Sequence, residues 1–342
     1  MKPDSMTPSS GVCSDMAGKG IIDKSVRLSG VVGQEKAKKL ITRTVSTGRI
    51  GHAYLFRGPE GVGKKMFAQI FAAWLNCPQP LADGGCGTCP SCRKYRSGNH
   101  PDICYVEPEN GAIKIDQIRT FCRSLAYPPY ESAYRVSILE DVHEMRAEAA
   151  NSLLKTLEEP PSQNVLVLTA ESSKAVLPTI ISRCQELPFY ELSRADSVAV
   201  LQQHRPDLEA AKLELLARLS EGCPGKALRL AENELVELYE KSVRVLEQTG
   251  SDNLESGDEV LLKLSAEMAT LKDELFPFFG LLRIWIAAKM REASQLRNWS
   301  QPYQKQLCFI DEAERQLQRN CNRNLVCEVL LFNLQSSVAR LS

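Results

Sequence analysis

The segment from Gly58 to Lys65 constrains the fold of this 342-residue chain more than any other stretch. It reads G-P-E-G-V-G-K-K and follows the phosphate-binding pattern G-x-x-x-x-G-K-[ST] except at its last position. A run of strand-forming residues at 52–56 precedes it, and a helical pattern at 64–75 follows it. In that context, backbone amides at the helix N-terminus surround a phosphate and the lysine reaches the β and γ phosphates. A glycine-rich turn before a helix is the plain alternative. The pattern favours a nucleotide-binding type of loop, with the candidate residues Gly58, Gly61, Gly63 and Lys64.

Lys65 stands where this pattern has a serine or a threonine. The hydroxyl of that residue binds magnesium, whereas an ammonium group cannot bind the ion and repels it. Two unit charges about 4 Å apart repel by ~4 kcal/mol at an effective dielectric constant of ~20, and a divalent ion doubles the effect. This is an upper bound, because Lys65 can turn into solvent, but the missing ligand is not restored. We therefore expect no bound magnesium and impaired hydrolysis, while passive binding of ATP or ADP stays open.

A second candidate site follows the apolar run 136–139, which ends in Glu140 and Asp141. In ATP-hydrolysing proteins with this loop, an aspartate after such a strand serves magnesium, and an acidic neighbour activates water. The order is reversed here, so Glu140 is too long for the first role and Asp141 is one methylene short for the second. A displacement of about 1 Å can lower a rate on the order of 10²-fold. The alternative is an ordinary solvated pair of acids at a strand end.

Short apolar runs alternate with helical patterns between residues 31 and 189. The runs have the length and composition of buried parallel strands, and the intervening patterns have helical spacing. Such alternation predicts a three-layer α/β domain with a parallel sheet. The expected strands are 52–56, 103–106, 136–139 and 165–169, and the expected helices are 35–47, 64–75, 115–124 and 147–157.

The pattern becomes helical throughout after Pro188. Residues 193–203, 208–220 and 225–233 predict a small helical domain. Residues 235–248, 259–269, 275–291, 304–319 and 324–339 predict a further all-helical domain, with a loop at 252–257. A chain of this length is expected to hold two or three domains. We expect a flexible extension at 1–28, an α/β domain at 29–190, a small helical domain at 191–236 and a C-terminal helical domain at 237–342.

The overall charge limits the kinds of partner. Lysine plus arginine and aspartate plus glutamate number 42 each, so the net charge is zero, whereas a purely electrostatic nucleic-acid binder is basic. Contact with DNA would need a local patch or other subunits. No apolar run approaches the length of a membrane span, and residues 1–24 lack the apolar core of a signal peptide. We expect a cytoplasmic protein.

Four of the twelve cysteines form a cluster with the spacing C-x8-C-x2-C-x2-C. In a cytoplasmic chain such spacing indicates a metal site rather than disulfides. Four thiolates can close a tetrahedral zinc site and leave no position open for chemistry. The sequence therefore predicts a structural zinc knuckle at 77–92, held by Cys77, Cys86, Cys89 and Cys92.

Two further motifs accompany the loop and the knuckle: N-S-L-L-K-T-L-E-E-P-P at 151–161, and Ser182-Arg183-Cys184. Together they resemble bacterial DNA polymerase III clamp-loader subunits of the AAA+ class. The resemblance has specific motifs from about residue 31 to residue 233 and only helical character beyond. It implies a ring of five related subunits, each with a nucleotide-binding domain, a small helical lid and a helical collar. It also implies the partners: gamma/tau and delta subunits, and, through the complex, the sliding clamp and primer-template DNA, with no membrane.

ATP-hydrolysing members of this family have an intact loop, an Asp-Glu pair and a sensor arginine in the lid. This chain departs from them at Lys65, at Glu140-Asp141 and at Gly225, where the resemblance puts that arginine. The stretch G-x-P-G-x-A-L at 222–228 is similar to the delta-prime type of subunit, the non-hydrolysing stator of the ring. The resemblance also puts Thr169 at the position of a polar sensor residue at a strand end.

Arg183 gains a role from the same resemblance. In the family, S-R-C carries an arginine finger that enters the ATP site of the neighbouring subunit. A finger supplied in trans can be worth roughly 10³–10⁵ in rate. A structural arginine after a strand is the alternative that the residues alone would favour.

The resemblance thus implies a stator subunit that helps to load the sliding clamp during chromosomal replication. It would be a component of a DNA-directed DNA polymerase holoenzyme, with no polymerase activity and little or no ATPase activity of its own. Two enzymatic alternatives stay open. One is an ATP-hydrolysing gamma/tau subunit, which Lys65 and Gly225 disfavour. The other is an unrelated P-loop nucleotide kinase, which the zinc knuckle and the helical domains disfavour.

Overall fold

The computed structural model describes residues 25–109, 111–232, 235–248, 254–295 and 301–338. These residues form two compact units, each described by itself below. The first contains residues up to 203 together with 221–226, and the second contains 204–220 together with the residues from 227 onward. The predicted domain boundaries after residues 28, 190 and 236 remain predictions.

A parallel sheet of five strands, in the order β2-β3-β4-β1-β5, lies at the centre of the first unit. Four of its strands fall within one residue of the predicted runs, because strands buried on both faces are continuously apolar. These are β1 (Ala53–Arg57), β2 (Ile103–Val106), β3 (Arg135–Leu139) and β4 (Asn164–Ala170). The fifth, β5 (Gln185–Pro188), was not expected from the sequence, because it is a short edge strand whose first two residues are exposed.

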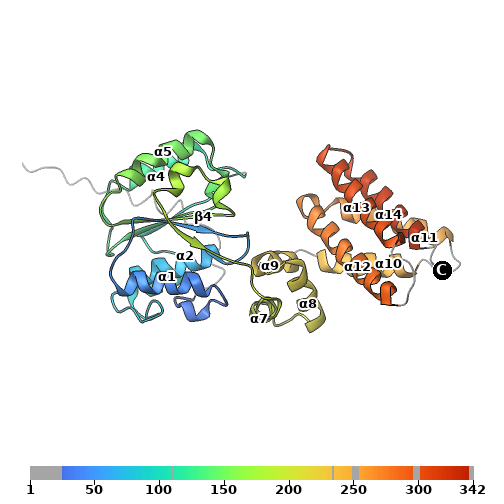
Figure 1. The fold of residues 1–342 in the computed structure, drawn as a ribbon, viewed down its shortest axis with the longest axis horizontal. Coiled ribbons are helices and arrows are strands. Elements are labelled where there is room, and N and C mark those ends of the chain that lie inside the picture. Colours follow the sequence, from blue (N-terminus) through green and yellow to red (C-terminus); the bar gives the residue numbers. More distant parts are fainter. Residues whose placement is uncertain (1–24, 110, 233–234, 249–253, 296–300, 339–342) are drawn as a thin grey trace, which may run out of the picture. The chain divides into compact units, whose positions relative to one another are not determined.

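Helices cover both faces of the sheet and complete the predicted three layers (Figure 1). The side chains of β1 alternate between the two cores: Tyr54 and Phe56 belong to one, and Ala53 and Leu55 to the other. One face packs against α1 (Glu35–Ser46), α2 (Lys64–Leu75) and α3 (Pro90–Arg96). The other packs against α4 (Ile115–Ser124), α5 (Ala147–Glu158) and the short α6 (Pro178–Ile181).

The segment before α1 packs against the loop that carries the predicted metal ligands. Val26 and Leu28 are buried, and Arg27 pairs with Gly84 in an isolated antiparallel bridge. Of the predicted extension 1–28, only residues 25–28 are described, and they belong to the packed unit. Residues 1–24 lie outside the described part of the chain.

The second unit is helical, as the periodicity predicts. After α7 (Arg194–His204), it contains α8 (Ala210–Leu219), most of α9 (Pro224–Glu232), α10 (Leu235–Gln248), α11 (Leu254–Ala269), α12 (Leu275–Gln295), α13 (Gln301–Gln318) and α14 (Arg323–Val338). Helix α14 packs against α11 and α13, and α12 packs against α10 and α13. The predicted loop at 252–257 is wrong from residue 254 onward, because α11 begins at Leu254. Within the described residues, we find no helix that is both long and apolar enough to cross a membrane.

Candidate functional site

The glycine-rich loop connects β1 to α2 at the carboxyl edge of the sheet. Gly61 and Gly63 adopt left-handed backbone conformations, with φ angles of 77° and 100°, which side chains disfavour. This local geometry explains why the loop needs glycine at both positions.

Lys64 is buried, and its ammonium group binds the loop itself. Its Nζ donates hydrogen bonds to the carbonyl oxygens of Gly58, at 2.6 Å, and Pro59, at 2.9 Å. Burial lowers the pKa of Lys64, and Asp141, Glu171 and Glu60 oppose that shift because their negative charges lie nearby. The lysine predicted to reach phosphates is therefore folded back onto carbonyls, in surroundings that contain three acids.

The first turn of α9 lies against the loop. The backbone N–H of Gly225 donates a hydrogen bond to the carbonyl oxygen of Gly61 at 2.8 Å. A Cβ atom added at Gly225 would lie 2.8 Å from the Cα of Gly61, so no side chain fits between the two backbones. The position where the family resemblance puts a sensor arginine is therefore occupied by a backbone contact.

Lys65 forms a two-way ion pair at the carboxyl ends of neighbouring strands. Its Nζ lies 2.7 Å from Oε1 of Glu107, which follows β2, and 2.7 Å from Oε1 of Glu140, which follows β3. Burial opposes the charge on Lys65, but the two carboxylates outweigh it and raise the pKa of Lys65. Burial raises the pKa of Glu140 to about 7, although Lys65 works against that shift.

Asp141 and Thr169 meet at the same edge. The backbone N–H of Asp141 donates to Oγ1 of Thr169, the sixth residue of β4, at 3.0 Å. Asp141 has a left-handed backbone with a φ angle of 47°, and burial raises the pKa of its carboxyl group. The structure therefore brings together the loop, both acids of the inverted pair and Thr169.

Arg183 lies apart from this cluster, at the amino-terminal ends of the strands rather than at their carboxyl-terminal ends. It precedes β5, whereas the loop follows β1, and the two strands are parallel with Tyr54 beside Gln185 and Arg57 beside Pro188. Four residues of strand separate the two edges by at least about 10 Å. Arg183 therefore lies too far from the loop of its own chain to contact a phosphate bound there.

The guanidinium group of Arg183 is held near the surface. Its Nη1 donates to the carbonyl oxygen of Thr179 at 2.9 Å and to Oγ of Ser182 at 3.1 Å, and its Nη2 lies 2.6 Å from Oε1 of Glu158. The side chain is 34% exposed, so it is not a buried structural arginine. Cys184, the last residue of the motif, is half-buried.

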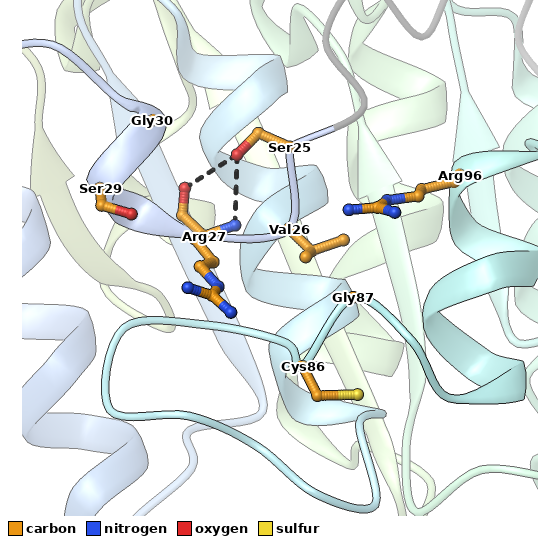
Figure 2. A pocket seen from close by; sticks show the side chains of 8 residues that line it. All are labelled: Ser25, Val26, Arg27, Ser29, Gly30, Cys86, Gly87 and Arg96. Carbon is orange, nitrogen blue, oxygen red and sulfur yellow. Dashed lines mark hydrogen bonds between the residues drawn. The ribbon is translucent and has the colours of Figure 1, made fainter.

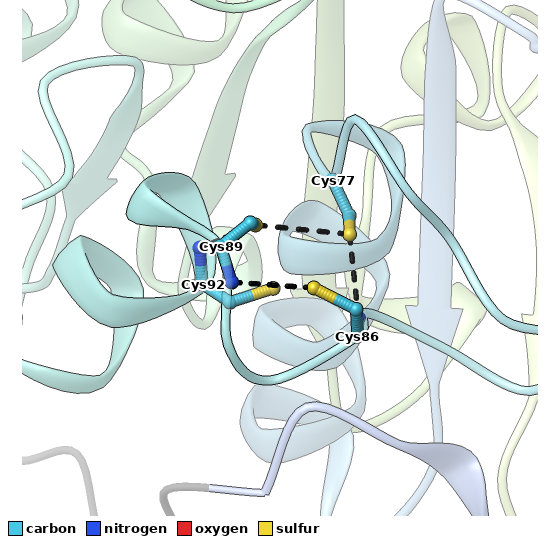
Figure 3. Close-up of side chains that lie close together, drawn as sticks. All are labelled: Cys77, Cys86, Cys89 and Cys92. Carbon is cyan, nitrogen blue, oxygen red and sulfur yellow. Dashed lines mark hydrogen bonds between the residues drawn. The ribbon is translucent and has the colours of Figure 1, made fainter.

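The cysteine cluster has the chemistry and the compactness of a metal centre (Figure 3). The Sγ atoms of Cys77, Cys86, Cys89 and Cys92 all lie within 4.8 Å of one another. Backbone N–H groups of the cluster donate to sulfur: that of Cys86 to Cys77, that of Cys89 to Cys86 and that of Cys92 to Cys89, at 3.3–3.4 Å. Such bonds favour thiolates, and an all-sulfur donor set of this size fits a tetrahedral zinc ion.

A surface pocket of about 380 Å³ lies beside the cluster, between the segment before α1 and the cysteine loop (Figure 2). Arg27 and Arg96 contribute guanidinium groups to its lining, next to Cys86. The pocket therefore has two cationic side chains in its lining, beside the cysteine loop.

Comparison with known proteins decides the family. A model described as "DNA polymerase III, delta subunit" matches residues 33–193. The chain is 34% identical over 311 residues to DNA polymerase III subunit delta' of Pseudomonas aeruginosa, a match that spans 83% of this chain and 92% of that protein. The chain belongs to the DNA polymerase III delta-prime family. Its membership confirms the clamp-loader resemblance read from the motifs.

Relatives of two types match this delta-prime family chain over a little more than 60% of its length. DNA polymerase III subunit delta' of Bacillus subtilis is 35% identical over 216 residues, which is 63% of this chain and 64% of that protein. DNA polymerase III subunit tau of the same organism is 32% identical over 215 residues, 61% of this chain and 38% of the relative. The chain thus matches less than two thirds of the length of either Bacillus protein.

Sequence reasoning missed two acids in this delta-prime family member, Glu107 and Glu158. Glu107 directly follows an apolar run at the same sheet edge as Glu140, and this placement was the signal available. Glu158 belongs to the L-E-E-P-P motif, but its contact with Arg183 spans 25 residues and depends on how α5 and α6 pack.

Proposed function

We propose that this chain is the stator subunit of a DNA polymerase III clamp loader. In this role it completes a ring with gamma/tau and delta subunits and helps to load the sliding clamp onto primed DNA. It does not hydrolyse ATP, and it contributes Arg183 to the ATP site of a neighbouring subunit. The proposal follows the names of its relatives, which are DNA polymerase III delta' and tau subunits.

The observation that carries the proposal is the ion pair of Lys65 with Glu107 and Glu140. Magnesium in such sites requires oxygen ligands in near-octahedral geometry, and a hydroxyl belongs at this position. Here an ammonium group stands between the two carboxylates and supplies a single positive charge in place of a metal. Without the metal, charge that develops on a transferring phosphoryl group is not neutralised.

The closed loop supports the same conclusion. Lys64 donates to the carbonyls of Gly58 and Pro59, and Gly225 bonds to Gly61. A phosphate would have to separate Lys64 from these carbonyls and would meet acids in place of a counter-ion. We therefore propose that this site binds neither magnesium nor a nucleoside triphosphate as part of the protein's function. The residues concerned are Gly58, Gly61, Gly63, Lys64, Lys65, Glu140, Asp141 and Thr169.

The position of Arg183 supports a role in trans. It belongs to the S-R-C motif that precedes β5, at the amino ends of the strands, whereas its own loop lies at their carboxyl ends. Its side chain is partly exposed. A guanidinium group so placed can meet only a phosphate that another chain holds. An arginine finger stabilises charge in the transition state of phosphoryl transfer and forms no covalent bond.

The cysteine cluster has a structural role in this proposal. Cys77, Cys86, Cys89 and Cys92 would hold one zinc ion, which fixes the loop after α2 and has no open position for a substrate. Because the net charge of the chain is zero, primer-template DNA is reached through the complex. We expect the assembly to work in the cytoplasm.

Hydrolysis of magnesium ATP by the purified chain alone tests the proposal against the gamma/tau alternative. We expect no turnover above the background of a Lys64→Ala variant. Turnover at the rate of an ordinary clamp-loader motor subunit would instead identify the chain as a motor. Membership of the delta-prime family already argues against the unrelated nucleotide kinase.

A further inference from the structure

We propose that Glu158 is a positioning residue that holds Arg183 in the orientation in which it meets the neighbour's ATP. This inference rests on the proposed role of Arg183 in trans and names a second residue on which that role depends. The carboxylate does not contact the ATP. It acts on the guanidinium group that does.

The contacts of Arg183 show how its orientation is set. A guanidinium group has five N–H donors in a fixed plane. Both donors of Nη1 are used by Thr179 and Ser182, and one donor of Nη2 is used by Glu158. Thr179 and Ser182 hold Nη1 in place, and Glu158, through Nη2, sets how the guanidinium plane is rotated about Nη1. Nε–H and the second Nη2–H have no partner within the described part of the chain and remain for a phosphate.

Both ends of the ion pair stand on a rigid base. Leu157, the neighbour of Glu158, and Ile180, in the helix before Arg183, are each 1% exposed and belong to the same hydrophobic core. The backbone that carries each of the two side chains is therefore anchored in the core beside the sheet. An arginine side chain left free would lose considerable rotamer freedom at each encounter with ATP.

The location of Glu158 argues that its contact with Arg183 is more than helix stabilisation. Glu158 is the last residue of α5, where the partial negative charge of the helix C-terminus disfavours a carboxylate. The residue thus works against its own helix while it binds Arg183. Glu159, the next residue, is also exposed and acidic but contacts no cation in the described structure, which makes it a matched control.

The test uses a reconstituted clamp-loader ring in which only the site facing this chain keeps a finger. The motor subunits carry an arginine-to-alanine change in their own S-R-C motifs, so kcat and KM for ATP report that one site. We expect Glu158→Ala to lower kcat by roughly threefold to tenfold with KM unchanged, because a misoriented group is lost from the transition state only. We expect Glu158→Gln to keep most of the activity, since its amide oxygen still accepts from Nη2, and Glu159→Ala to match wild type.

Arg183→Ala separates the two claims. If Glu158 acts through Arg183, Glu158→Ala lowers kcat no further in the Arg183→Ala background. An equal loss in both backgrounds, or wild-type kcat for Glu158→Ala, would overturn the positioning role and leave the finger intact. Wild-type kcat for an assembled Arg183→Ala ring would overturn the finger and the positioning role with it. If the Glu158→Ala ring does not assemble, the kcat values of Glu158→Gln and Glu158→Asp decide. The proposal requires a higher kcat for Glu158→Gln, because the shorter side chain of aspartate moves the accepting oxygen away from Arg183. A higher kcat for Glu158→Asp would overturn it.

Discussion

Removing the charge of Lys65 is the sharpest physical test of the site. In Lys65→Met, Glu107 and Glu140 lose the cation that both contact at 2.7 Å, so their nearest oxygens lie no farther apart than twice that distance. Two carboxylates about 5 Å apart repel by roughly 3 kcal/mol at an effective dielectric constant of about 20. Partial exposure of both side chains screens this repulsion, so we expect about 1–2 kcal/mol of local destabilisation at pH 8.

The loss should depend on pH with a definite sign. The pKa of Glu140 is raised to about 7 in the folded chain, mainly by burial, and removal of Lys65 raises it further. Between the unfolded pKa and this folded pKa, the folded state binds more protons than the unfolded state, so stability falls as pH rises. Near pH 5 Glu140 is protonated and the repulsion with Glu107 disappears. We therefore expect the destabilisation to be large at pH 8 and close to zero at pH 5.

Hydrogen–deuterium exchange of the full-length chain measures this locally. Peptides that cover β1, α2 and β3 should exchange faster in Lys65→Met at pH 8, after correction for intrinsic rates, and at the wild-type rate at pH 5. Lys38→Met is the control, because the one carboxylate that Lys38 pairs with among the described residues is that of Glu35, which is 69% exposed on the surface of α1. A penalty that is equal at both pH values, or greater at pH 5, would refute the view that Lys65 serves as the counter-ion of the two carboxylates.

Three further predictions concern the closed loop, the metal and the nucleotide. Gly225→Ala should loosen the loop by about 1–3 kcal/mol, since the new Cβ would lie 2.8 Å from the Cα of Gly61; unchanged exchange across residues 58–63 would contradict this. Metal analysis should find about one zinc ion per chain and less in Cys86→Ser, whereas a folded chain free of zinc would remove the metal assignment. In a titration with ATP, magnesium should neither produce nor strengthen binding, and a tenfold tightening with magnesium would show that Lys65 does not exclude the ion.

The architecture of the first unit could largely be predicted from the sequence. Strands β1 to β4 and helices α1, α2, α4 and α5 lie within one residue of their predicted bounds, because burial on both faces imposes apolar runs and amphipathic helices impose their period. Strand β5 was not predicted, because its first residues, Gln185 and Glu186, are exposed and polar and do not form an apolar run. The first residues of α11 were predicted as a loop, because Ser256 and Gly257 are residue types typical of loops.

The candidate site was less accessible from the sequence, because its decisive contacts join distant residues. The motif identified Lys65 as a departure, but only the fold shows that Glu107, 42 residues away, completes its ion pair. The bond between Gly225 and Gly61 and the return of Lys64 onto the loop carbonyls likewise depend on tertiary packing. Local spacing cannot predict such contacts.

The central claim is that this chain has lost its own reaction and supplies Arg183 to another. The most direct test is ATP hydrolysis by an assembled ring whose motor subunits lack their own S-R-C arginines, with Arg183→Ala in this chain. A ring with Arg123→Ala, an exposed arginine on α4, is the control. The account predicts that both rings assemble and that Arg183→Ala lowers hydrolysis at the facing site roughly 10³-fold or more, while Arg123→Ala does not. An assembled Arg183→Ala ring that hydrolyses ATP at the wild-type rate would contradict it.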